Sequence, residues 1–335
     1  MRFLFRCRRL NNFKLIAAAL LIIAAAFILS GCERQNVQTA VVNGDDVQAE
    51  PAAVEYIYGI PLDEKAGVIS HNIADVYASP NVKSERITQA LYNQPVSIIS
   101  NENGWAEVKT VSGFKGWIKS KYIDSDISSL FGRNYTHRII VTSREKTVYA
   151  YPTGGATRII APMGTELYAF NNIDDSYEVY LPGNKTGWVQ GSGIIHLGVE
   201  GIIPVTNAED FAATALRLKG VSYLMNGMSA SGIDAPGLVY ICARINGINL
   251  PSTIKGQLAS GTQIKPENAL AGDLVFLSYT GETNAEEISC VGVCIGGGNY
   301  IYAGRKAGYV TIGEINRENA DGIVVDVRRI FNTTS

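Results

Sequence analysis

Hydrophobic and polar residues follow three different patterns along this chain of 335 residues. The first is a basic stretch, then an unbroken apolar run from Leu15 to Leu29. A run of about 15 apolar residues is short for a membrane span of about 20, and it is typical of the apolar core of a secretory signal peptide. We therefore predict a signal peptide at 1–31. The polar segment that follows predicts a disordered tether at 32–55.

The second pattern covers residues 56 to 200, where short β-branched and aromatic runs alternate with Gly, Asn, Asp and Pro. Two segments of the first half recur in the second, so one unit occupies about 70 residues. The repeated segments are Val76–Pro80 with Val148–Pro152, and Gly116–Ile118 with Gly187–Val189. Short strands at this spacing predict two small all-β barrels, one at 56–126 and one at 134–200.

The third pattern begins near residue 205, where apolar residues first recur at helical spacing and then form β-branched runs. Helices followed by antiparallel strands indicate an α+β domain, which we place at 205–333. The expected helices are 210–218, one that begins near Pro236, and a short one at 254–259. The expected strands are 273–277, 289–295, 300–303 and 323–329, with a further one possible at 309–312.

Charge, glycine and cysteine patterns argue against several classes of ligand. The formal net charge is −2, which argues against a nucleic-acid partner. Gly296–Asn299 predicts a hairpin turn and not a phosphate loop, because no helix follows it, so we expect no cofactor. On one strand Cys290 and Cys294 would lie about 13 Å apart, too far for a disulfide. As a metal pair they lack further ligands, so we expect no metal.

The segment Ser229–Tyr240 reads as a polar loop that runs into a helix. With Leu218–Gly227 before it and Leu270–Phe276 after it, this segment resembles the NlpC family of papain-like cell-wall peptidases. The family's loop reads Asp-Cys-Ser-Gly, and its Cys is the nucleophile at the start of the helix. The matching positions here are Asp234–Gly237, and Ala235 stands in place of the nucleophile.

The two other catalytic positions of the family are also replaced. The family has a His in His-Val-Gly-Ile-Tyr-Ile-Gly on the next strand and a polar residue twelve positions later. The corresponding residues here are Cys290 and Tyr302. The chain has three histidines, and none lies beyond His196, so the C-terminal domain contains no histidine base. The degenerate triad positions Ala235, Cys290 and Tyr302 therefore predict a domain without catalytic residues.

The alternative is that the domain is an active peptidase whose nucleophile lies at a different position from that of the family. Cys290 would lie on the cleft wall and act as a non-standard nucleophile of an active γ-D-glutamyl-diamino acid endopeptidase. A thiol without a neighbouring base is mostly protonated at neutral pH, which favours an ordinary buried cysteine.

Two residues that match the family's recognition elements remain. Tyr223 matches the Tyr of Tyr-x-Trp-Gly-Gly, and Asp234 matches the Asp of Asp-Cys-Ser-Gly. In relatives with SH3 domains that Asp holds the free amine of the peptide's terminal L-Ala, so the resemblance implies that Tyr223 and Asp234 bind ligand. The residues alone equally allow Asp234 to be a helix N-cap.

Two further resemblances complete the organisation. The barrels resemble bacterial SH3-like domains, and Trp105, Trp117 and Trp188 are expected in or against their cores. Leu29-Ser30-Gly31-Cys32 resembles the lipobox of bacterial lipoproteins, which implies lipidation of Cys32. The protein would then be lipid-anchored in the cell envelope, at the outer membrane in a Gram-negative cell.

We expect a papain-like NlpC-type α+β domain preceded by two all-β SH3-like barrels. The expected function is that of a catalytically inactive peptidase homologue. Its expected partner is a peptidoglycan peptide or a cell-envelope protein. A scaffold whose old cleft is filled is the third hypothesis, with Met225 and Tyr302 as the residues bulky enough to fill it.

Overall fold

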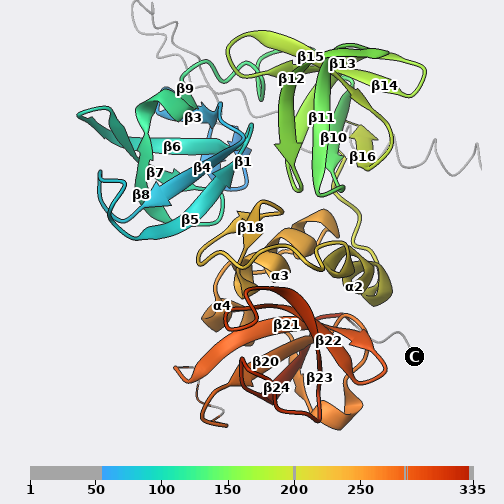
Figure 1. Ribbon diagram of the computed structural model, residues 1–335. Helices are drawn as coiled ribbons and strands as arrows, with labels where there is room; N and C mark the ends of the chain where they lie inside the picture. The colour runs from blue at the N-terminus through green and yellow to red at the C-terminus, as the bar shows by residue number, and fades with distance from the viewer. Residues whose placement is uncertain (1–54, 199–200, 283, 285, 332–335) are drawn as a thin grey trace, which may run out of the picture. The chain divides into compact units, whose positions relative to one another are not determined.

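The computed structural model describes residues 55–198, 201–282, 284 and 286–331. The predicted signal peptide with Cys32, and the predicted tether up to residue 54, lie outside the described residues. Two seven-stranded antiparallel sheets come first in the chain, and a six-stranded antiparallel sheet with three α-helices follows (Figure 1). Among the helices that this part of the chain contains, none is long and apolar enough to cross a membrane.

The first sheet has the strand order β5-β4-β8-β7-β6-β3-β9. A small hairpin of β1 (Tyr56–Ile57) and β2 (Ile60–Pro61) precedes it. The strands of the sheet are β3 (Ala66–Ile69), β4 (Ile73–Tyr77), β5 (Arg86–Leu91), β6 (Pro95–Glu102), β7 (Trp105–Thr110), β8 (Lys115–Lys119) and β9 (Ile123–Asp124). Alternate residues of β7 point into the buried cluster, as expected for a strand with one face toward a core.

The second sheet has the order β12-β11-β15-β14-β13-β10-β16, which repeats the first strand for strand. Its strands are β10 (His137–Val141), β11 (Glu145–Tyr151), β12 (Gly154–Pro162), β13 (Glu166–Ile173), β14 (Ser176–Leu181), β15 (Lys185–Gln190) and β16 (Ile194–Gly198). The sequence repeat therefore encodes one topology twice. Trp188 is 8% exposed, whereas Trp105 and Trp117 are half-buried. All three belong to strands that pair at the centre of their sheets.

The C-terminal domain combines its helices with a sheet of order β19-β24-β20-β21-β22-β23. The helices are α2 (Ala208–Leu216), α3 (Ala235–Ile245) and α4 (Ile254–Leu258). The strands of this sheet are β19 (Thr262–Ile264), β20 (Leu274–Ser278), β21 (Ile288–Gly296), β22 (Asn299–Gly304), β23 (Tyr309–Glu314) and β24 (Ile323–Arg329). A two-stranded hairpin, β17 (Met228–Ser229) and β18 (Gly232–Ile233), leads into α3. This is the α+β arrangement that the sequence predicts.

The helices begin at polar caps. The Asn207 side chain accepts a hydrogen bond from the Asp210 amide, so α2 starts at Ala208, two residues before the predicted start. Helix α3 is capped by Asp234, has Pro236 in its first turn, and is buried along nearly its whole length. It packs on β21 in the main core. The short strands β17, β18 and β19 were not predicted, because two or three residues carry no readable alternation.

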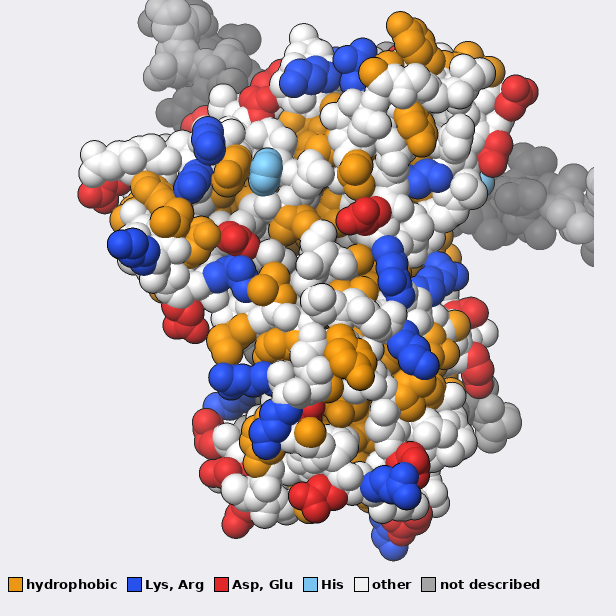
Figure 2. All heavy atoms as spheres, viewed as in Figure 1, with side chains coloured by type: hydrophobic (Ala, Val, Ile, Leu, Met, Phe, Trp, Pro, Cys, Tyr) orange, Lys and Arg blue, Asp and Glu red, His pale blue; other side chains and the backbone are white. Residues whose placement is uncertain are grey.

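Charge is mixed over the surface. On the face in view in Figure 2, the Lys and Arg side chains and the Asp and Glu side chains are interspersed, and neither sign covers a continuous area. This agrees with a net charge of −2 and gives no surface for a polyanion on that face.

Candidate functional site

The start of α3 is where the resemblance places the nucleophile. Ala235 is the first residue of the helix, and Asp234 before it is the N-cap residue. One oxygen of the Asp234 carboxylate accepts a hydrogen bond from the Gly237 amide at 2.8 Å, and the other accepts one from the Asn226 amide at 3.0 Å. The cap is therefore formed. The side chain of Ala235, which is 4% exposed, offers a methyl group where a thiol is needed.

The Asp234 carboxyl has a perturbed acidity. Burial raises its pKa to about 6, although the amides of Gly237 and Asn226 and the charge of Arg86 act in the opposite direction. The carboxylate is thus mostly ionised at pH 7 and mostly protonated at pH 5. A buried anion of this kind can bind a cation such as an ammonium group, and it does so only above its pKa.

Cys290 lies on β21 in the wall against which α3 packs. It is 4% exposed, and its sulfur lies 3.7 Å from the carbonyl oxygen of Val291 and 3.9 Å from that of Ala303. Burial raises the pKa of the Cys290 thiol, and the charges of Asp321 and Asp234 raise it further. The thiol therefore lies in the core, which is the ordinary buried cysteine that the sequence favours, and the accessible position on a cleft wall that the alternative requires is not observed.

Tyr302 lies on β22, paired with Gly292 of β21. Its side chain is 2% exposed, and its ring lies 5.3 Å from that of Tyr300. Burial, followed by the charge of Asp321, raises the pKa of the Tyr302 hydroxyl. A hydroxyl with so high a pKa stays protonated at neutral pH and is a poor proton acceptor.

Asp321 is the residue at this site that the sequence reasoning missed. It is 1% exposed, and its carboxylate accepts hydrogen bonds from the amides of Lys306 at 2.8 Å and Ala307 at 3.4 Å. Its charge raises the pKa of Cys290, Tyr302 and Tyr279. A cysteine nucleophile needs a nearby positive charge to hold its thiolate. The charged groups that shift the pKa of Cys290 are the carboxylates of Asp321 and Asp234, and their negative charges disfavour a thiolate.

Tyr223 lies beside Asp234. It forms an isolated β-bridge with Ile233, and its amide donates to the carbonyl of Gly308 at 2.8 Å. Its side chain is half-buried, and burial followed by the Asp234 charge raises its pKa. The two proposed ligand residues are therefore close enough to interact. Met225 is 44% exposed, so it does not fill the core of the old site.

The first barrel contacts the loop at residues 225–228, which precedes Asp234 in the chain. Arg86 donates from Nη2 to the carbonyl of Met225 at 2.7 Å, and the Asn226 side chain donates to the carbonyl of Arg86 at 2.7 Å. The amide of Met228 donates to Gln89 Oε1 at 2.9 Å. Strand β5 thus holds the loop that carries Asn226, whose φ is 57°. That loop in turn supplies the amide that binds Asp234.

A metal site is not evident in the part of the chain that the structure describes. No group of three or more His, Cys, Asp or Glu residues there is placed to hold a metal ion. Cys242, Cys290 and Cys294 are buried free cysteines.

Two family models match the sequence. Residues 220–329 match the NlpC/P60 family, and residues 74–124 match the bacterial SH3 domain. A relative of similar organisation is the gamma-D-glutamyl-L-lysine dipeptidyl-peptidase of Bacillus subtilis, which is 22% identical over 307 residues, or 86% of this chain and 92% of that protein. The gamma-DL-glutamyl hydrolase of the same organism is 33% identical over 133 residues, or 39% of this chain and 31% of that protein.

Solved structures agree on the fold. An NlpC/P60 family protein from Bacillus cereus superposes with a TM-score of 0.70 at 20% identity, and the match covers 79% of this chain and 99% of that one. An NlpC/P60 endopeptidase from Photobacterium damselae superposes with a TM-score of 0.55 at 13% identity, over 79% of this chain and 72% of that one.

Proposed function

Because the domain at residues 220–329 belongs to the NlpC/P60 family, whose members related to this chain are cell-wall peptidases, we propose that this protein binds the stem peptide of peptidoglycan without cleaving it. The observation that carries the proposal is the chemistry at the start of α3, where Ala235 replaces the thiol. The other two triad positions hold a buried thiol and a buried phenol, which supports the loss of catalysis.

Recognition is proposed to outlast catalysis at Tyr223 and Asp234. The catalytic positions are sealed, whereas Tyr223 stays half-buried and Asp234 carries a negative charge above pH about 6. In this proposal the free α-amine of a terminal L-Ala pairs with the Asp234 carboxylate, beside the ring of Tyr223. The cap hydrogen bonds use one lone pair of each carboxylate oxygen, so each oxygen keeps an acceptor site.

The cellular setting is part of the same proposal. The lipobox at Cys32 supports a lipid-anchored protein in the cell envelope, and the tether would let its domains reach the cell wall. The alternative partner is a protein of the cell envelope, which would bind this chain in place of the peptide.

The alternative function is that of an active γ-D-glutamyl-diamino acid endopeptidase that uses Cys290. The relatives' activities favour it. The burial of the Cys290 thiol and the negative charges of Asp321 and Asp234 oppose it, because both disfavour a thiolate.

Calorimetric titration of the full chain with L-Ala-γ-D-Glu-diaminopimelate at pH 7.5 tests the binding proposal. We expect N-acetylation of the peptide to weaken binding at least about tenfold, since it removes a charge-assisted hydrogen bond. Asp234→Asn should weaken it similarly, whereas Asp210→Asn, at an exposed position in the first turn of α2, should leave it unchanged. Equal binding of the acetylated and free peptides would contradict the role of Asp234. Absence of any binding would favour the scaffold reading.

A further inference from the structure

A cavity of about 700 Å³ lies between the first barrel, the second barrel and the C-terminal domain. Tyr58 of the β1–β2 turn, Arg138 of β10 and Arg244 of α3 line it. Its volume is that of a site for a small organic molecule. Its lining includes none of Tyr223, Asp234, Cys290 and Tyr302. Along α3, Arg244 is nine residues from Ala235, or roughly 13 Å, so the cavity is separate from the old catalytic site.

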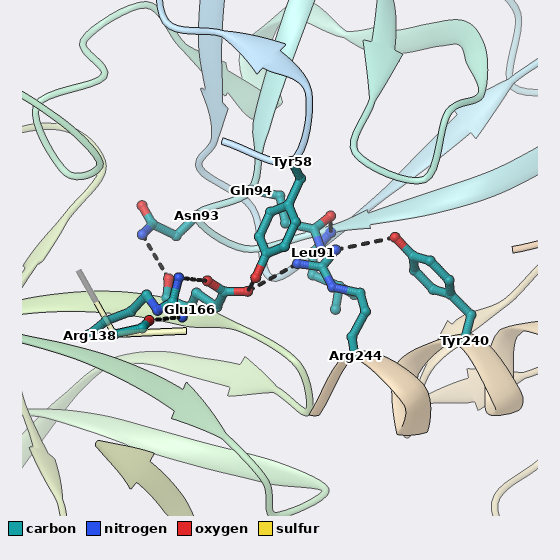
Figure 3. A network of polar contacts seen from close by, with 9 residues as sticks. Tyr58, Leu91, Asn93, Gln94, Arg138, Glu166, Tyr240 and Arg244 are labelled. Carbon is teal, nitrogen blue, oxygen red and sulfur yellow. Dashed lines mark hydrogen bonds and ion pairs between the residues drawn. The ribbon is translucent and has the colours of Figure 1, made fainter. Parts of the chain in front are cut away.

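The cavity wall carries two arginines and one carboxylate. Arg244 Nη2 lies 3.0 Å from Glu166 Oε1, whereas Arg138 Nη1 lies 4.0 Å from Glu166 Oε2 (Figure 3). Among the described residues, Glu166 is the one acidic side chain paired with either arginine. Because both guanidinium groups stay charged, a net charge of about +1 is left in this wall.

The hydrogen-bonding capacity of these groups is only partly used. Tyr58 and Arg244 both donate to Oε1 of Glu166, while Oε2 accepts no hydrogen bond. Arg138 donates to the carbonyl of Gly201 at 2.6 Å, and its Nε is buried without a partner. Its side chain is 16% exposed. A buried cation with a loosely held counter-ion is costly unless another anion completes its pairing.

The rest of the wall is aromatic and apolar. The guanidinium of Arg244 lies 4.0 Å from the ring centroid of Tyr58 and 5.7 Å from that of Tyr240. Arg244 also donates from Nη1 to the Tyr240 hydroxyl at 3.3 Å, so contacts with Tyr58, Tyr240 and Glu166 fix the direction of its guanidinium before any ligand arrives. Ile248 and Pro251 add apolar side chains to the lining of the cavity.

We propose that this cavity binds a small ligand in which one oxyanion, a carboxylate or a phosphate ester, is attached to an apolar body. The oxyanion pairs with Arg138 and Arg244 and neutralises the excess charge of the wall. The apolar body packs on Tyr58, Tyr240 and Ile248. The three parts of the chain that form the wall are thereby linked through the ligand.

Saturation-transfer NMR on the full chain tests this with three probes: N-acetyl-leucyl-alanine, its C-terminal amide, and inorganic phosphate. We expect the acid to bind at least about tenfold more tightly than the amide, as one charge-assisted hydrogen bond predicts. Displacement of the acid by inorganic phosphate would identify a phosphate-bearing ligand as the better fit. Absence of displacement would identify a carboxylate. Absence of binding by the acid and by phosphate would overturn the proposal.

Variants separate a ligand site from a purely structural clamp. Arg138→Gln should weaken the acid at least about tenfold, and Asn249→Trp, which fills the cavity without a change of charge, should abolish binding. Arg158→Gln on exposed β12 is the matched control and should have no effect. Glu166→Gln should tighten binding, because it raises the net charge of the wall. Weaker or unchanged binding in folded Glu166→Gln protein would overturn the electrostatic argument.

Discussion

The acidity of Asp234 predicts that the contribution of this carboxyl to the stability of the protein is lost as the pH rises from about 4 to about 6. Burial raises the pKa of this carboxyl from its ordinary value of 3.8 to about 6, so the folded state holds the proton more tightly than the unfolded state does. The contribution is therefore favourable at low pH and is lost as the group ionises. With 1.36 kcal/mol for each unit of pKa, the contribution of Asp234 to the free energy of unfolding should fall by about 3 kcal/mol across this window.

Urea unfolding of the wild type and of Asp234→Asn at pH 4.5 and pH 7 measures this effect. The asparagine can still accept from the Gly237 amide, but its NH₂ group faces the amide of Asn226. This mismatch lowers stability by an amount that does not depend on pH. Between the two pH values, the wild type should therefore lose about 2 kcal/mol more than the variant, since part of the titration lies below pH 4.5.

The difference between the two proteins in the loss of unfolding free energy reports on Asp234 alone, because every other titrating group contributes equally to both. Asp210→Asn on the exposed first turn of α2 should follow the wild type. Parallel pH profiles of wild type and Asp234→Asn would show that the carboxyl is not perturbed in the folded state. A wild type that gains stability relative to the variant on raising the pH would refute the reasoning about burial outright.

Three further predictions concern the core and the domain contacts. Glu166→Gln should lower the free energy of unfolding by about 3 kcal/mol, because it leaves buried arginines without their counter-ion. Glu286→Gln, in the exposed pair with Lys255, should lower it by less than about 1 kcal/mol. Urea unfolding compares the two variants, and equal losses would contradict the burial argument. Phe211→Ala should cost about 3–5 kcal/mol, since this fully buried ring lies in the main core, and a loss below about 1 kcal/mol would refute its placement. Alkylation of Cys290 by iodoacetamide, followed by peptide mass spectrometry, should be at least about a hundredfold slower in the folded protein than in urea, and comparable rates would show an exposed thiol.

The fold could be predicted from the sequence where its signals are local. The Val-x-x-x-Pro and Gly-Trp segments occur twice and mark two sheets of identical strand order. Pro236 predicts a helix that begins near it, and α3 begins at Ala235 with Asp234 as its N-cap. The family matches confirm the NlpC-type domain and the first SH3-like unit, the second sheet repeats the strand order of the first, and a superposed structure agrees on the fold. The domain bounds and the site assignments stay predictions.

The rest could not be predicted because it depends on residues that are distant along the chain. Glu166 meets Tyr58 across 108 positions and Arg244 across 78, and no local pattern announces either contact. Asp321 lies in a turn that reads as surface, yet backbone amides fifteen residues away hold it in the core.

Digestion of purified muropeptides by the full-length protein, read by mass spectrometry, tests most directly whether catalysis has been lost. The substrates include L-Ala-γ-D-Glu-diaminopimelate, and the control is Cys290→Ala. We predict that the γ-D-glutamyl bond stays intact with both proteins, since no activated thiol stands at the start of α3. Cleavage by the wild type that disappears in Cys290→Ala would contradict this account and make that thiol the nucleophile.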